Sequence, residues 1–135
     1  MIIKKYNIEL HRLDRNDLEL VRSHRNSDAI REKMFFQDEI TAEAQEHWFL
    51  NIDNEFNYYF VVHWKGVKVG LIHGTITSLE KKEATGGVFF WDKTFVQTYM
   101  PVCASIIMGD LSFILLNMNK STAVVRSDNE RALTH

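Results

Sequence analysis

Hydrophobic and polar positions along the 135-residue chain change their period several times. β-Branched and aromatic residues recur between Ile2 and His11, which predicts a first strand over that stretch. Apolar residues then recur three or four positions apart, which is the spacing of one helix face. This spacing predicts three helices, each after a polar capping residue. Their apolar residues are Leu18 and Val21 after Asp14 and Asn16, Ile30 and Met34 after Ser27, and Ala44, Trp48 and Ile52 after Thr41.

From residue 58 the chain has the pattern of strands. Residues 58–64 form a dense β-branched and aromatic run that stops at Lys65-Gly66, and another run starts at Val67, so a β-hairpin is predicted. The second strand is predicted to continue through Ile76. After a charged turn at residues 80–83, a further strand is predicted over residues 87–91. Three strands therefore follow one another in this part of the chain.

The next segment, residues 101–118, predicts a long helix that packs on a core. One face carries its apolar side chains, which are Cys103, Ile107, Leu111, Ile114, Leu115 and Met118. Pro101 suits the first turn, where its missing N–H would have no partner within the helix. A short strand is predicted over residues 122–126, and Ser127 with Glu130 then matches a capping box that begins a last helix. That helix reaches only residue 135, so the pattern of elements is expected to be cut short.

Composition and charge limit the class of protein. With 45% hydrophobic residues, the chain is expected to form one core and a single domain over residues 1–135. The net charge of −2 comes from interspersed acidic and basic residues, which gives no basic stripe for a nucleic acid. No apolar run approaches the roughly 20 residues that cross a bilayer, and the N-terminus lacks a signal-peptide pattern, so a cytoplasmic protein without membrane contact is expected. Cys103 is the only cysteine and the histidines include no close ligand pair, so neither a disulfide nor a metal site is expected.

Two stretches of the chain carry motifs that occur together in one protein family. The first is residues 18–34 with Arg25-Asn26, followed by Ile40-Thr41 and Trp48-Phe49. The second comprises Leu116-Asn117-Met118-Asn119-Lys120, Val124-Val125 and Asn129-Glu130-Arg131-Ala132. With the order of elements, they resemble the GNAT N-acetyltransferases over essentially the whole chain, and the first is similar to the branch that acetylates amino sugars on nucleotide carriers or protein N-termini. The resemblance implies an α/β (α+β) fold with a mixed, mostly antiparallel sheet flanked by helices, from which the family's final strands are missing.

The GNAT resemblance also implies a site for acetyl-CoA, the co-substrate, between the fourth and fifth strands. Family members place its pyrophosphate against backbone N–H groups at the start of the long helix, where the helix dipole favours an anion. Their signature there is glutamine or arginine, two residues, glycine, one residue, then glycine or alanine. The matching stretch here is Gln97, Thr98, Tyr99, Met100, Pro101 and Val102. Met100 and Val102 add bulk and Pro101 removes one donor, so weaker pyrophosphate binding is expected; the alternative is a plain turn between strand and helix.

Two further positions match cofactor contacts of the family. Asn129 matches the asparagine that contacts the pantetheine arm or the neighbouring loop, and its alternative role is that of a helix cap. Phe89, Phe90 and Trp91 lie on the strand whose backbone would pair with the pantetheine amides. Aromatic side chains at this spacing are also typical of a core, so the resemblance implies only a backbone role for these three residues.

Acetyl transfer requires a base and an acid. The base removes a proton from the amine that attacks the thioester, and the acid protonates the leaving thiolate. His73 and Glu83 are the candidate bases, with a structural histidine and a solvated surface glutamate as the alternatives. Family members commonly use a tyrosine beyond the asparagine as the acid, and this chain ends before that position is matched. Arg25, Asn26 and Trp48 are candidates for the acceptor pocket, although such residues also tie helices together at a junction.

Two functions follow from the sequence. The first is a metal-independent N-acetyltransferase that moves an acetyl group from acetyl-CoA to the primary amine of a small acceptor, either an amino sugar or a protein N-terminus. The second is a non-catalytic GNAT-like remnant or binding module, in which an exposed sheet edge promotes self-association as a homodimer. The chain has no Gly-x-Ser-x-Gly elbow, Walker loop or Gly-x-Gly-x-x-Gly turn, which argues against hydrolase and kinase functions. Binding of acetyl-CoA distinguishes the two functions.

Overall fold

The computed structural model describes residues 2–27, 39–111 and 120–123. It divides the chain into two compact units. The first, called the sheet unit here, comprises Met1–Arg12 and Glu55–Val124, and the second, the helical unit, comprises Leu13–Asn54 and Val125–His135. The predicted helix after Ser27, the end of the long helix and the capping box at Ser127 lie outside the described residues.

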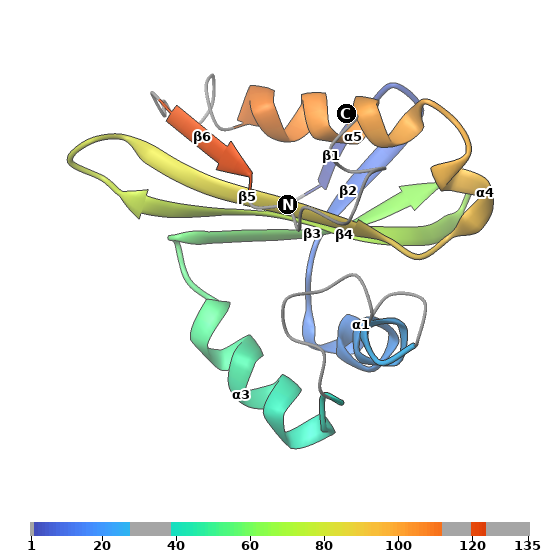
Figure 1. Cartoon of the computed structure of the whole chain (residues 1–135), viewed down its shortest axis with the longest axis horizontal. Helices are drawn as coiled ribbons and strands as arrows, with labels where there is room; N and C mark the ends of the chain where they lie inside the picture. The colour runs from blue at the N-terminus through green and yellow to red at the C-terminus, as the bar shows by residue number, and fades with distance from the viewer. Residues whose placement is uncertain (1, 28–38, 112–119, 124–135) are drawn as a thin grey trace. The chain divides into compact units, whose positions relative to one another are not determined.

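The sheet unit contains a sheet of six strands whose spatial order is their order in the chain (Figure 1). The strands are β1 (Ile2–Lys5), β2 (Ile8–Arg12), β3 (Asn57–Trp64), β4 (Val67–Ser78), β5 (Glu83–Phe90) and β6 (Lys120–Ala123). Strands β1 to β5 pair antiparallel with their neighbours, whereas β6 pairs parallel with β5. This arrangement confirms the prediction of a mixed, mostly antiparallel sheet.

Two tight turns explain where the N-terminal and central hairpins form. Lys65 and Gly66 both have positive φ angles, 52° and 77°, which suits the predicted two-residue turn between β3 and β4. Tyr6 and Asn7 also have positive φ angles, 56° and 64°. The predicted single strand from Ile2 to His11 was therefore wrong, because the chain reverses at Tyr6-Asn7 and forms β1 and β2. The hydrophobic pattern did not show this turn, since neither residue is a glycine.

The helical unit contains the short helix η1 (Arg15–Asp17), α1 (Leu18–Arg25) and α3 (Ala42–Ile52). Asp14 forms a capping box with Asp17 at η1, and the Thr41 hydroxyl accepts a hydrogen bond from the N–H of Ala44, as expected of caps. The predicted buried face of α3, with Ala44, Trp48 and Ile52, was wrong by one position.

Gln45 and Phe49 are the buried residues of α3. The hydrophobic pattern did not indicate that Gln45 is buried, because glutamine is polar. Its side-chain amide donates to the carbonyl oxygen of Leu18 at 3.1 Å, which satisfies the buried group and ties α3 to α1.

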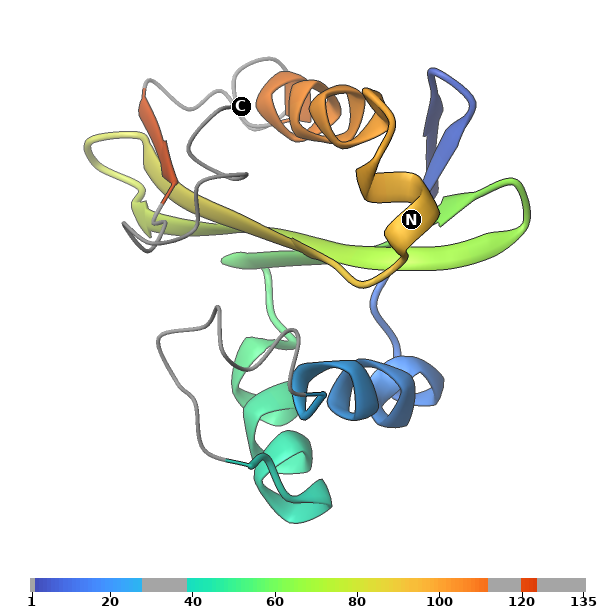
Figure 2. The ribbon, with the colours of Figure 1, turned by 45° about the vertical axis from the view of Figure 1, so that its right-hand side comes forward.

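Two helices of the sheet unit, α4 (Lys93–Val96) and α5 (Met100–Asp110), follow β5. Helix α5 runs across one face of the sheet (Figure 2). Its buried side chains are Met100, Pro101, Ala104, Ile107 and Met108. Met100, Ala104, Ile107 and Met108 join a core with Ile8, Leu10, Phe60, Val62, Val69, Ile72, Phe95 and Leu111.

Pro101 lies in the first turn of α5, as predicted. The predicted core face needs one correction, because Cys103 is half-buried and only packs against the core. Ala104 and Met108 take the buried positions on the turns that follow Met100. The predicted face therefore missed two buried side chains, Ala104 and Met108.

Two glycines of the sheet unit give opposite predictions for alanine substitution. Gly109→Ala should raise the free energy of unfolding by about 0.5–1 kcal/mol, because Gly109 lies inside α5 and its added Cβ meets none of the described residues within 4 Å. Gly70→Ala should lower it by about 1–3 kcal/mol. Its Cβ would lie 2.4 Å from Cδ1 of Phe90 and 2.7 Å from the carbonyl oxygen of Phe89. Urea unfolding of both variants measures this, and a Gly70→Ala variant as stable as Gly109→Ala would contradict the packing.

Candidate functional site

Alternate residues of β5 direct their backbone hydrogen-bonding groups away from β4. The Trp91 N–H donates to the Val69 carbonyl oxygen at 3.0 Å, which continues the antiparallel register of β4 and β5. Backbone groups along an antiparallel strand alternate in direction, so the N–H and C=O of Val88 and Phe90 point away from β4. The described pairs between β5 and β6 run from Glu83 to Gly86. Val88 and Phe90 therefore lie beyond the last of these pairs.

The aromatic side chains at the end of β5 take part in packing. Phe90 packs against Phe95, with ring centroids 5.0 Å apart, and Phe89 lies on the opposite face, 5.5 Å from the Trp91 ring. The Trp91 indole donates to the Lys68 carbonyl oxygen at 2.8 Å. Among Phe89, Phe90 and Trp91, only Phe90 has backbone groups that point away from β4, so the predicted cofactor role can belong only to the Phe90 backbone, and it stays a prediction. Sequence reasoning missed Val88, because the direction of a backbone group depends on strand register.

The loop that leads into α5 has most of its N–H groups engaged. The N–H groups of Gln97, Thr98, Met100 and Val102 all donate to acceptors a few residues earlier in the chain. Their acceptors are, in order, the Thr94 carbonyl, the Phe95 carbonyl, the Thr98 hydroxyl and the Tyr99 carbonyl. Pro101 has no N–H. An anion at this helix start would have to compete with these bonds.

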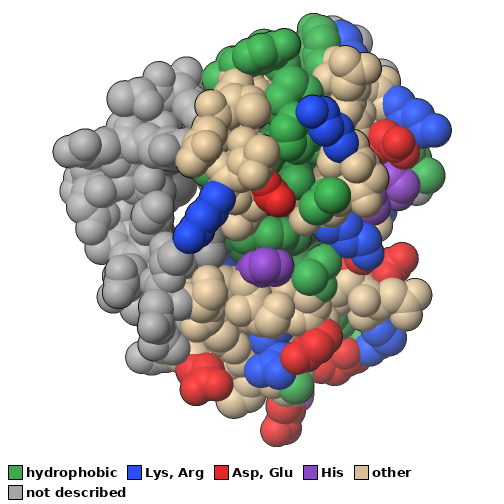
Figure 3. Space-filling model, turned by 90° about the vertical axis from the view of Figure 1, so that its right-hand side faces the viewer, with side chains coloured by type: hydrophobic (Ala, Val, Ile, Leu, Met, Phe, Trp, Pro, Cys, Tyr) green, Lys and Arg blue, Asp and Glu red, His purple; other side chains and the backbone are tan. Residues whose placement is uncertain are grey.

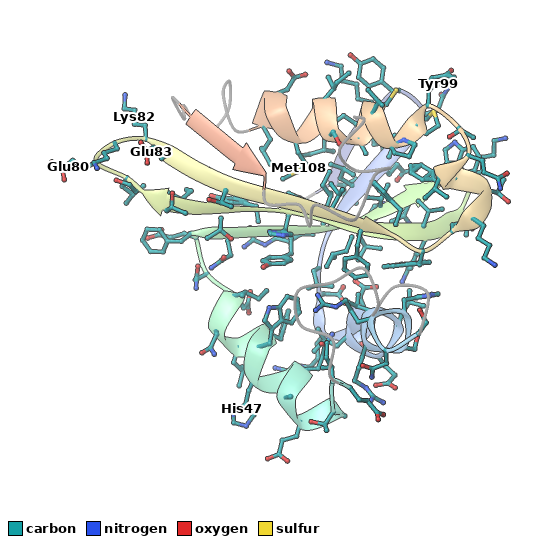
Figure 4. The ribbon with its side chains drawn as sticks, in the orientation of Figure 1. His47, Glu80, Lys82, Glu83, Tyr99 and Met108 are labelled. Carbon is teal, nitrogen blue, oxygen red and sulfur yellow. The ribbon has the colours of Figure 1, made fainter. Side chains whose placement is uncertain are left out.

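The side chains of this loop differ in direction. Met100 is 7% exposed and belongs to the core, whereas Val102 is 41% exposed and Tyr99 is 75% exposed. Figure 4 shows Tyr99 projecting from the start of α5. The expected bulk at the pyrophosphate position therefore comes from Val102 and not from Met100, because Met100 faces the sheet.

His73 lies on the sheet face opposite α5, in a row across three strands. Its register partners are Tyr59 on β3 and Gly87 on β5. The rings of Tyr59 and His73 stack with centroids 4.7 Å apart and an interplanar angle of 9°. On the other side, a Cβ added to Gly87 would lie 2.7 Å from Nε2 of His73. The imidazole therefore extends over β5, the strand whose outer edge is described above.

The second candidate base, Glu83, lies far from His73. Both side chains belong to the same face, but Glu83 is four residues along β5 from Gly87, the partner of His73. At roughly 3.3 Å per residue this separation is about 13 Å. Figure 4 shows Glu83 beside Glu80 and Lys82, close to the end of the β4–β5 hairpin. The structure does not bring the two candidate bases together.

Uncharged polar side chains lie on one side of His73 on its face of the sheet, whereas Leu71 and Phe89 form the next cross-strand pair on the other side. Thr75 and Thr85 are the next cross-strand pair, and Asn57 pairs with Thr75 on the other side. The Thr75 hydroxyl donates to Oδ1 of Asn57 at 2.8 Å. All three are half-buried. This patch offers hydroxyl and amide groups, with no net charge of its own.

The acceptor-pocket candidates Arg25, Asn26 and Trp48 belong to the helical unit, where Asn26 has a structural role. Its side-chain amide donates to the Ile40 carbonyl oxygen at 2.8 Å and accepts from the Ile40 N–H at 2.7 Å. Arg25 and Trp48 are half-buried. The acceptor role of these three residues stays a prediction. Asn129 lies outside the described residues.

Other kinds of site find no support in the described residues. No group of three or more His, Cys, Asp or Glu residues there could hold a metal ion. None of the described helices is both long enough and apolar enough to span a membrane. On the face in Figure 3, Lys and Arg side chains lie among Asp and Glu side chains.

Similarity to known proteins is found in the structure and not in the sequence. No protein-family model and no curated protein matches the sequence. Among solved structures, spermidine N-acetyltransferase from Vibrio cholerae in complex with CoA and spermine matches with a TM-score of 0.79 and 20% identity, over 96% of this chain and 78% of that chain. The chain has the GNAT acetyltransferase fold.

Two more solved structures share the GNAT fold with this chain. A probable acetyltransferase matches with a TM-score of 0.81 and 16% identity, over 99% of this chain and 79% of that chain. Aminoglycoside acetyltransferase AAC(6')-Ib in complex with coenzyme A matches with a TM-score of 0.80 and 13% identity, over 94% and 79% of the two chains. The predicted GNAT fold is confirmed, whereas the predicted amino-sugar and protein N-terminus branch stays a prediction.

Proposed function

We propose that the protein is an N-acetyltransferase that moves an acetyl group from acetyl-CoA to the primary amine of a small acceptor. The observation that carries this proposal is the position of His73, whose imidazole extends over Gly87 of β5, next to Val88, the nearer of the two residues with outward backbone groups. A base and a strand edge that could hold an extended ligand thus lie next to each other on a GNAT fold.

The residues at β5 fit an acetyl-CoA molecule in part. The outward N–H and C=O groups of Val88 and Phe90 would pair with the amides of the pantetheine arm, as one strand pairs with another. The pyrophosphate would lie toward residues 97–102, where most N–H groups already have acceptors. Affinity is therefore expected to come more from the pantetheine arm than from the phosphates.

His73 would act as the general base of the transfer. Bound acetyl-CoA supplies the acetyl thioester. The amine nitrogen bonds to the carbonyl carbon, the carbon–sulfur bond breaks, and CoA leaves as its thiolate. The proton lost by the amine passes to a ring nitrogen of His73, directly or through water. Nε2 is the nitrogen nearest to β5.

An amino sugar is the acceptor that the patch beside His73 supports best. Asn57, Thr75 and Thr85 offer neutral hydrogen-bonding groups, which suit the hydroxyls of a sugar. A protein N-terminus is the second acceptor class.

A melting curve with and without acetyl-CoA tests the proposal. At 100 times its dissociation constant the ligand should stabilise the fold by roughly 2.7 kcal/mol, which is several degrees for a chain of this size. Adenosine monophosphate, which lacks the pantetheine arm, serves as the control and should give a much smaller shift. A folded protein whose melting temperature does not respond to acetyl-CoA would overturn the enzyme proposal.

The second candidate function is a non-catalytic binding module that self-associates. The engaged N–H groups of residues 97–102 and the exposed side chain of Val102 favour it, because both weaken a pyrophosphate site. This function predicts no acetyl-CoA response. It also predicts a dimer, which sedimentation over a range of protein concentrations would detect.

A further inference from the structure

Two consecutive glycines in the middle of β5 lie beside His73. Gly86 and Gly87 both belong to a strand with neighbours on either side. Glycine inside a strand is unfavourable, by roughly 0.5–1 kcal/mol relative to alanine, and it often marks a close approach of other atoms. A Cβ at Gly86 would lie 3.0 Å from the His73 carbonyl oxygen, and one at Gly87 would lie 2.7 Å from Nε2 of its ring. Both glycines thus make room for the same histidine.

The Tyr59 ring restricts the orientation of the imidazole from the β3 side. Its ring stacks on that of His73 at 4.7 Å with an angle of only 9° between the planes. Rotation of the imidazole about its bond to Cβ would break this parallel stack. The ring is therefore held between an aromatic plane on β3 and a glycine on β5, with Nε2 on the β5 side.

We propose that Tyr59 and Gly87 are positioning residues that hold the His73 imidazole over β5, where it meets the acceptor amine. This inference rests on the proposed function. Tyr59 contributes the plane of its ring, and Gly87 contributes the space left by its missing side chain. Neither residue takes part in proton transfer, so their replacement acts only through the orientation of His73.

Three variants test the positioning role in acetyl transfer. Tyr59→Phe keeps the aromatic plane and should retain the wild-type rate within about twofold. Tyr59→Leu removes the plane and Gly87→Ala displaces Nε2, so each should lower kcat on the order of 10- to 100-fold, the effect expected of a misplacement of about 1 Å. The KM for acetyl-CoA should stay unchanged, and the dependence of kcat on pH should change in these two variants only. Folded Tyr59→Leu and Gly87→Ala variants with wild-type kcat and pH dependence would overturn the proposal.

Nuclear magnetic resonance of the wild-type protein tests the same geometry without activity and without a variant that has to fold. Nuclear Overhauser contacts should join the His73 ring protons to the Hα protons of Gly87 and to the ring protons of Tyr59. Their absence would overturn the proposal even if the enzyme is active. Their presence in a protein that neither binds acetyl-CoA nor transfers its acetyl group would instead reject the proposed function and reduce the two residues to a structural role.

Discussion

Replacement of Phe95 by alanine is expected to lower the free energy of unfolding by about 3–5 kcal/mol. Phe95 is 0% exposed and lies in α4, the four-residue helix that connects β5 to α5. Its ring is 5.4 Å from that of Trp64 and 5.0 Å from that of Phe90. Alanine would leave a cavity where β3, β5 and α4 meet, because no other side chain fills the space of the ring. Helix α4 also depends on this packing, since a helix of one turn has little stability of its own. Urea unfolding followed by circular dichroism measures the change.

Tyr99→Ala provides the matched control for Phe95. Tyr99 is also aromatic and follows in the same connection, but its side chain projects into solvent. Its replacement should change stability by less than about 0.5 kcal/mol. Equal losses from the two substitutions would contradict the distinction between a core ring and a surface ring.

His73→Gln is expected to lower kcat for acetyl transfer by about 100- to 10,000-fold, the usual contribution of a general base. Glutamine keeps a polar side chain of similar length but accepts no proton near neutral pH. The KM for acetyl-CoA should change little, because the proposed contacts to the co-substrate come from the backbone of Val88 and Phe90. Thiol release from acetyl-CoA with an amino-sugar acceptor measures the rate.

Glu83, the other candidate base, leads to the opposite prediction. If Glu83 removed the proton, Glu83→Gln would show the large loss of kcat and His73→Gln would not. Glu83 and Gly87, the register partner of His73, lie about 13 Å apart along β5, so one amine cannot transfer its proton to both side chains. A His73→Gln variant that keeps the wild-type rate would therefore rule out His73 as the base and direct attention to Glu83.

Local sequence patterns predicted the elements well where the signal was contained in neighbouring residues. The hairpin at Lys65-Gly66, the Thr41 cap and the proline in the first turn of α5 are confirmed, because turn and cap chemistry depends on residues close in the chain. The Tyr6-Asn7 turn was missed, since a turn without glycine or proline has a weak signal. The buried face of α3 was shifted because Gln45 is buried through a hydrogen bond to α1.

The candidate site was predicted only as a set of residue types. The sequence identified His73 and Glu83 as bases but could not rank them, because their separation depends on strand register. It assigned bulk to both Met100 and Val102, whereas packing against the sheet removes Met100 from the loop surface. Val88 carried no signal, since its proposed role belongs to a backbone group.

The sequence by itself predicted most of the strands and helices, the Thr41 cap, the Lys65-Gly66 turn and the resemblance to GNAT acetyltransferases, because these depend on short-range patterns and on element order. Tertiary structure decided which side chains meet across strands. The stack of Tyr59 on His73 and the room that Gly87 leaves for the imidazole join residues 14 positions apart in the chain, on adjacent strands. Such contacts depend on register, since a shift of one residue turns every side chain to the other face of the sheet.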